Sequence, residues 1–158
     1  MSYKNFKKAL KLAKKCDGYD VGNGKSDAII SKASELLGIK FSKQNYVYFS
    51  KLGYLEFFGV EVFGIMKDDF SGAPETNCVE TALADRQEHN LPNEWLPIYF
   101  FDDGYYGYLD YSQLNKDGEP QVIMAIYNGK EYIVAEKVAE DFGDFLLNLV
   151  KESLEDNN

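Results

Sequence analysis

Histidine and cysteine are scarce in this 158-residue chain, which contains one histidine and two cysteines. A histidine-based metal site is therefore not expected. Cys16 and Cys78 lie far apart in the sequence and form no Cys-x-x-Cys pair, so nothing suggests a zinc site. Both thiols are predicted to be reduced and buried or idle, as in a cytosolic protein. We expect no metal and no cofactor.

Long apolar runs are also missing. A bilayer span needs about 18 or more consecutive apolar residues, and no such run occurs. The lysine-rich start, MSYKNFKKALKLAKK, lacks the apolar centre and the cleavage site of a secretory signal. We therefore expect a cytoplasmic protein with no membrane partner. The length suits one domain, and a hydrophobic content of 45% allows a sizeable core.

Positive charge is concentrated in the first third of the chain. Residues 1–51 contain 11 lysines and four acidic residues, a net charge of +7. Residues 52–158 contain six basic and 22 acidic residues, a net charge of −16. This larger part would repel nucleic acid and attract a basic protein. The alternative is that the acidic surface only keeps the protein soluble.

The stretch GYDVGNGKSD, residues 18–27, ends like a phosphate-binding loop but fails on spacing. The motif requires a glycine five places before Gly24, where this chain has Tyr19, and Gly18 is one place too early. A lysine-rich helical pattern precedes it instead of a strand. We interpret the stretch as a flexible, glycine-rich connection, after which Ser26 or Asp27 caps a helix.

Helical periodicity appears in five segments of the chain. The expected helices are residues 2–16, a helix between Ser26 and Gly38, a helix from Ser42 to before Gly53, residues 74–89 with Pro74 in the first turn, and a closing helix with an apolar stripe of Val138, Phe142, Phe145, Leu146 and Leu149. The first is basic and amphipathic. It either docks on the protein's own core or marks a membrane surface or an anionic partner.

Strand patterns fill the middle of the chain. They cover residues 55–58, 60–65, 97–101, 105–111, 121–127 and 131–136, with a hairpin turn at residues 128–130. Helices first, strands in the middle and a helix last predict an α+β fold. We expect a single domain with a central, mostly antiparallel sheet flanked by helices. The predicted division is a basic helix and connection at 1–25, a main domain at 26–154 and a frayed tail at 155–158.

Few side chains in the sequence could form a catalytic site. Asp102 and Asp103 could pair with Asp110 or Glu61 as acid and base. However, adjacent carboxylates before a glycine are typical of a turn. We predict no catalytic residues and no enzyme, and keep an enzyme that uses Asp102 and Asp110 only as a third hypothesis.

The segment FFDDGYYGYLDY, residues 100–111, combines six aromatic residues with three aspartates. On a strand, alternate side chains face opposite ways, so Tyr106 and Tyr108 should share one face and Tyr105 the other. Tyrosines beside carboxylates suit a protein-binding surface. The alternative is a tyrosine-rich core with a solvated edge.

Several of these segments resemble one family when they are taken in order. They are ASELLGIKFSKQNYVYFSKLG, GVEVFGI, IYFFDDGYYGYLDYSQ, QVIMAIY and VAEDFGDFLLNLV. The order is similar to that of the SUKH superfamily, which includes yeast cell-wall-synthesis regulators and bacterial immunity proteins. The likeness covers about residues 26–150. The proline usual before the third helix is absent around Phe41 and Ser42, and the glycine pair often found near Gly53 is a single glycine.

The resemblance implies an α+β fold and a non-enzymatic function, which is the neutralisation of a cognate secreted toxin by binding. Such toxins are often nucleases or nucleic-acid deaminases with basic clefts, which an acidic inhibitor would match. The alternative is a regulatory scaffold that binds a host protein. The sequence carries no signal of oligomeric state. The residues that we predict to bind the partner are Glu56, Glu61, Asp102, Asp103, Tyr105, Tyr106 and Asp110.

Overall fold

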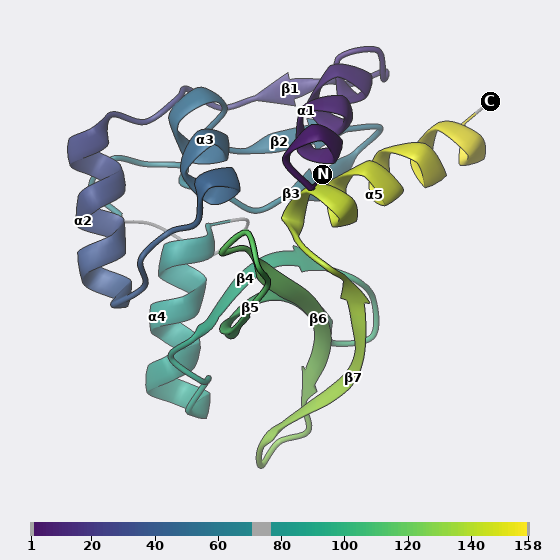
Figure 1. Cartoon of the computed structure of the whole chain (residues 1–158). Coiled ribbons are helices and arrows are strands. Elements are labelled where there is room, and N and C mark those ends of the chain that lie inside the picture. The colour runs from purple at the N-terminus through teal and green to yellow at the C-terminus, as the bar shows by residue number, and fades with distance from the viewer. Residues whose placement is uncertain (1, 71–76, 158) are drawn as a thin grey trace.

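The computed structural model describes residues 2–70 and 77–157 (Figure 1). Its elements, in chain order, are α1 (Ser2–Ala13), β1 (Asp20–Val21), α2 (Asp27–Leu37), α3 (Lys43–Lys51), β2 (Leu55–Phe57), β3 (Val60–Val62), α4 (Cys78–His89), β4 (Trp95–Phe100), β5 (Tyr105–Leu114), β6 (Pro120–Tyr127), β7 (Tyr132–Ala139) and α5 (Phe142–Asp156). The α+β prediction is confirmed. Among the helices of the described ranges, none is long and apolar enough to cross a membrane.

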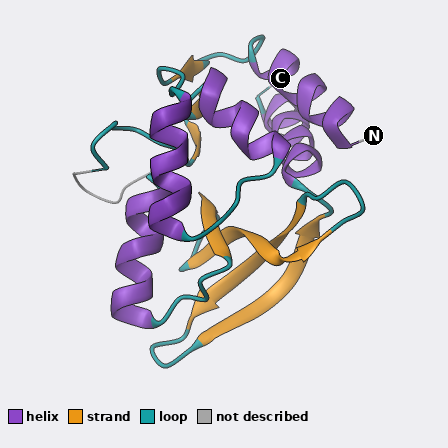
Figure 2. Cartoon of the chain, turned by 60° about the vertical axis from the view of Figure 1, so that its left-hand side comes forward, coloured by secondary structure: helices purple, strands orange, loops and turns teal. Residues whose placement is uncertain are grey.

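The strands form two antiparallel sheets where the sequence predicted one. The small sheet has the order β1-β2-β3, and the large sheet has the order β4-β5-β6-β7. A backbone hydrogen bond of 2.8 Å from the Phe63 N–H to the Ile98 carbonyl joins the chain after β3 to β4. The sheets are thus adjacent parts of one fold, with helices gathered beside and above the large sheet (Figure 2).

The predicted helix caps are confirmed. The Ser26 hydroxyl accepts the Ile29 N–H at 3.3 Å and opens α2. Gly38 closes that helix in the left-handed region at φ 67°, where a side chain would be strained. The Ser42 hydroxyl accepts the Asn45 N–H at 3.3 Å and opens α3. These ends were predictable because capping is local chemistry.

Other element boundaries differ from the predictions. The predicted helix at 74–89 is described from Cys78, and Pro74 lies outside the described residues. Val138 belongs to β7, not to the closing helix, because Asp141 accepts the Asp144 N–H at 2.9 Å and starts α5 only there. At its other end α5 continues through Asp156, so the predicted tail at 155–158 begins as helix.

Helix α1 docks on the protein's own core, the first of the two alternatives for this basic segment. Phe6, Ala9 and Ala13 are buried. The Phe6 ring lies 6.1 Å from that of Phe142 in α5, beside which α1 runs (Figure 1). The apolar stripe of α1 is therefore occupied, and only its lysine side faces outward. The predicted division at residue 25 stays a prediction.

The large sheet has two aromatic faces. On one face Phe145 of α5 contacts the rings of Tyr99 and Phe101, at centroid distances of 5.6 and 6.3 Å. Tyr106 and Tyr108 share the other face, as predicted, and their rings are 6.3 Å apart. Helix α4 lies along that face beside β4 (Figure 1). Tyr108 is buried, whereas Tyr106 is half-buried.

Candidate protein-binding surface

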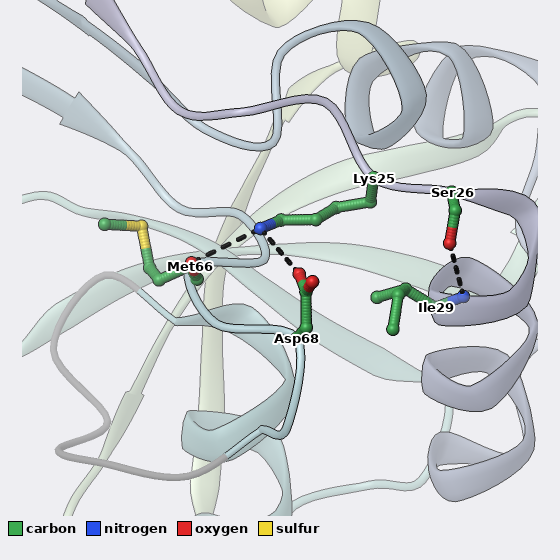
Figure 3. Close-up of polar contacts among 5 residues, drawn as sticks. All are labelled: Lys25, Ser26, Ile29, Met66 and Asp68. Atoms are coloured by element: carbon green, nitrogen blue, oxygen red, sulfur yellow. Dashed lines mark hydrogen bonds and ion pairs between the residues drawn. The ribbon is translucent and has the colours of Figure 1, made fainter.

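Lys25, the lysine of the stretch that resembles a phosphate-binding loop, makes its polar contacts within the protein. The Lys25 side chain is only 7% exposed, and its ammonium lies 3.1 Å from the Asp68 carboxylate. It also donates to the Met66 carbonyl at 3.4 Å, beside the Ser26–Ile29 cap (Figure 3). Lys25 therefore holds the segment after β3 in place and offers no free cation for a phosphate.

Gly22 and Gly24 of the same connection pack closely against the rest of the fold, so the prediction of a flexible connection is wrong at these two positions. A Cβ added at Gly24 would overlap the Ser50 carbonyl oxygen, and one at Gly22 would come within 2.5 Å of the Tyr54 ring. In addition, the Lys25 N–H donates to the Phe49 carbonyl at 2.9 Å. Glycine is needed here because the backbone runs directly against α3 and its C-terminal turn.

Three carboxylates form a row across the small sheet. Asp20 lies opposite Glu56, and Glu56 lies opposite Glu61, so all three side chains point to one face. We call Asp20, Glu56 and Glu61 the acidic row. Asp20 and Glu61 are exposed and Glu56 is half-buried. The other face of β2 and β3 supplies buried apolar side chains to the core. The structure therefore joins the two predicted glutamates and adds Asp20.

A tight turn sets the register of this row. Phe58 and Gly59 both have positive φ, 51° and 76°, as in the two-residue turns that suit β-hairpins. Phe58 was predicted in a strand, but it lies in the turn.

The Tyr54 side chain lies beside the acidic row, and its hydroxyl donates to Asp20 at 3.0 Å. Burial, Asp20 and then Glu56 raise the pKa of the Tyr54 phenol, as expected beside the acidic row.

A second acidic position lies at the turn between β4 and β5. Asp102 and Asp103 are exposed, and Tyr105 is half-buried. Asp103 and Gly104 have φ values of 57° and 86°, and the Tyr105 N–H donates to the Asp102 carbonyl at 3.1 Å. Both aspartates thus form the turn, while their carboxylates remain on the surface. The side chains of Tyr105 and Tyr106 lie on opposite faces of the sheet, and Tyr106 faces α4.

Asp110 is a structural residue, which corrects its predicted place on the contact surface. Its side chain is buried, with 6% exposure. One carboxylate oxygen accepts the Ser112 N–H and hydroxyl, at 3.0 and 2.6 Å, and the other accepts the Gln121 amide at 3.0 Å. Asp110 also pairs with Trp95 at the far end of the β4–β5 hairpin, roughly 17 Å along the strand from the Asp102 turn. The structure therefore does not form the hypothetical acid–base pair of Asp102 and Asp110.

The residues of metal and thiol chemistry are dispersed. Cys16 and Cys78 are free and buried, and burial raises the pKa of the Cys78 thiol. Within residues 2–70 and 77–157, no three His, Cys, Asp or Glu side chains gather as a metal-binding group. His89 ends α4, as predicted, and its ring stacks on Tyr127 at 4.2 Å.

Two residues of the surface, Asp20 and Asp85, were not predicted from the sequence. Asp20 was missed because a two-residue strand carries no periodicity signal. Asp85 was missed because its role depends on tyrosines of two strands, β5 and β7, whose phenols its charge influences. One signal was available: Asp85 and His89 are four residues apart and so share a helix face.

Comparison with protein families agrees with this architecture. The family model described as SUKH_5, SMI1-KNR4 cell-wall, matches residues 9–151. This chain belongs to the SUKH family. The match begins inside α1 and ends inside α5, so the family's extent includes both sheets. The SUKH family is broadly associated with protein–protein interaction and is not in general a catalytic family. No curated protein matches the chain.

Proposed function

We propose that this chain is an immunity protein that binds a cognate secreted bacterial toxin and neutralises it by stoichiometric inhibition. The observation that carries the proposal is the acidic row. Like charges directly opposite one another destabilise a sheet. Asp20, Glu56 and Glu61 nevertheless stand side by side, and no lysine or arginine of the described residues forms an ion pair with them. A basic partner would relieve this repulsion.

The partner that fits is a nuclease or a nucleic-acid deaminase toxin. Such an enzyme needs a positively charged cleft for its polyanionic substrate. Glu56 and Glu61 lie in the part of the chain with a net charge of −16, and together with Asp20 they present a competing negative surface. Complementary potentials would also speed the encounter of the two proteins. Inhibition by binding requires no catalytic residue, and the proposed place of action is the cytoplasm.

The proposed contact surface combines the acidic row with Asp102, Asp103 and Tyr105 of the β4–β5 turn. These carboxylates are exposed or half-buried, and they make no ion pair within the described residues. Tyr105 adds a ring of the kind enriched at binding hot spots.

The test is co-expression with the protein encoded beside this gene, followed by co-purification and association kinetics in a salt series. Reversing Glu56 and Glu61 to lysine should slow association by about tenfold or more at low salt, and the difference should shrink as salt rises. Glu136→Lys, an exposed carboxylate on β7, is the matched control and should have little effect. Survival of the toxin-exposed cells without a complex, or equal slowing by the control, would refute the proposal.

A regulatory scaffold that binds a host protein is the second candidate. The observation that favours it is the description of the matching family, which refers to the cell wall. If no toxin is encoded nearby and the chain co-purifies with a host protein, the scaffold explains the same acidic row.

A further inference from the structure

Aromatic rings line the face of the large sheet that looks toward α4. His89 stacks on Tyr127 at 4.2 Å, and Tyr127 lies 5.1 Å from Tyr132 across the β6–β7 pair. Tyr132 lies 6.2 Å from Tyr108, which is 6.3 Å from Tyr106. The rings therefore form a continuous path from the end of α4 to β5. All but the buried Tyr108 are half-buried, so parts of these rings meet solvent.

Asp85 lies on α4 four residues before His89, so it shares the helix face from which the His89 ring stacks on Tyr127. It is half-buried and makes no hydrogen bond or ion pair with the described residues. Its charge lies close enough to Tyr106, Tyr108 and Tyr132 to add to burial in raising the pKa of each phenol. Burial also raises the pKa of Asp85 itself, while His89 lowers it. A partly buried charge without a hydrogen-bonding partner is costly.

Within residues 2–70 and 77–157, no lysine or arginine forms an ion pair with Asp85. Arg86, the next residue on α4, donates instead to the Asn93 carbonyl at 2.6 Å. His89 is one turn away, but it carries a charge only when it is protonated. Asp85 thus combines an unsatisfied negative charge with several aromatic rings, whose faces are also negative because of their quadrupoles.

We propose that Asp85, His89, Tyr106, Tyr127 and Tyr132 form a subsite for a lysine or arginine side chain of a protein partner. We call these five residues the aromatic–acidic subsite. A cation above a tyrosine face is attracted by the ring, and a carboxylate beside it completes the neutralisation. An arginine can also stack its planar guanidinium on a ring. The proposal rests on the proposed function only for the identity of the partner, because an acidic protein with this subsite suits any basic partner.

The first experiment needs no toxin. A capped Gly-Arg-Gly peptide is titrated against the full chain, with the fluorescence of Trp95 as the readout. Trp95 is the single tryptophan, and its ring lies 5.2 Å from Tyr108 and 5.9 Å from Tyr132. A saturable change is expected with arginine, and none with citrulline, which has the same shape but no charge. Equal responses to both peptides, or no response to arginine, would overturn the subsite.

Variants locate the binding. Asp85→Asn keeps the shape of the side chain and should weaken binding of the arginine peptide about tenfold. Tyr132→Ala should weaken it similarly, while Tyr132→Phe keeps the ring and should preserve binding. Asp117→Asn and Tyr46→Ala change exposed residues outside both the subsite and the proposed contact surface, so these matched controls should bind the peptide normally. Circular dichroism checks that each variant is folded. Unchanged affinity in both Asp85→Asn and a folded Tyr132→Ala would refute the assignment.

The two proposals fail separately. If the toxin binds but neither Asp85→Asn nor the arginine peptide affects the complex, the immunity function stands and the subsite is wrong. If the peptide binds with the expected variant pattern but no toxin does, the subsite stands and the proposed function is wrong. Competition of the arginine peptide with the toxin for wild-type protein is expected if both are right.

Discussion

The packing of α1 predicts that a single substitution near the N-terminus will strongly destabilise the whole fold. Phe6 is 0% exposed and lies between Tyr3 and Phe142, at ring distances of 5.9 and 6.1 Å. Replacing a buried phenylalanine by alanine costs about 3–5 kcal/mol, from lost burial and from the cavity left behind. The folded-to-unfolded ratio should then fall by about 10²- to 10⁴-fold. Because small domains are stable by only about 5–15 kcal/mol, the loss is large.

Urea denaturation followed by circular dichroism measures this effect. Phe6→Ala should lower the midpoint at an unchanged slope, which identifies a change of stability. Phe6→Leu retains most of the volume and should cost about 1–2 kcal/mol. Lys8→Ala, on the exposed side of α1, should stay within about 0.5 kcal/mol. A cost below about 1 kcal/mol for Phe6→Ala, comparable to that of Lys8→Ala, would refute the docking of α1 on α5.

Two further predictions concern the glycine-rich connection and a buried carboxyl. Gly24→Ala should lower the urea midpoint because its Cβ would overlap the Ser50 carbonyl oxygen. The control Gly59→Asn, at φ 76° in open space, should change the midpoint little. Equal midpoints for the two variants would contradict the close approach of Gly24 to Ser50. Burial, with a contribution from Asp141, raises the pKa of Glu119, so the folded state holds this proton more tightly than the unfolded state. Stability should therefore fall as the pH rises from the unfolded value, about 4.3, through the raised folded pKa, and Glu119→Gln should flatten that decline. Parallel stability–pH curves would exclude this role.

Much of the fold was predictable because its signals are local. The hydroxyls of Ser26 and Ser42 cap helices in the way that their sequence neighbours predicted. The Asn128-Gly129 turn was equally readable, and the Asn128 N–H donates to the Glu131 carbonyl at 3.0 Å. The predicted ends of helices and strands were wrong where a contact between distant residues decides the end. Val138 fits the stripe of a helix, but it lies in β7, where the β6–β7 register shifts, and α5 starts only after the Asp141 cap.

The candidate surface was predictable only in part. Glu56 and Glu61 flank a glycine in a strand pattern, so their pairing across a hairpin could be anticipated. That Asp20 extends the row depends on a two-residue strand crossing from the N-terminal connection. Asp110 has the same residue type as Asp102 and lies on the same hairpin, yet its burial beside Ser112 and Gln121 removes it from the surface. Residue type alone cannot separate these cases.

The sequence by itself determined the α+β class, the helix caps, the main hairpin turn and the opposed charges of the two parts of the chain, because composition and short-range chemistry fix these. Only the tertiary structure decided that the strands divide into two sheets, that the apolar face of α1 packs on α5, that Lys25 pairs with Asp68, and that Asp85 lies near tyrosines of two strands, β5 and β7. Each of these depends on contacts between residues far apart in the chain, which sequence periodicity does not encode.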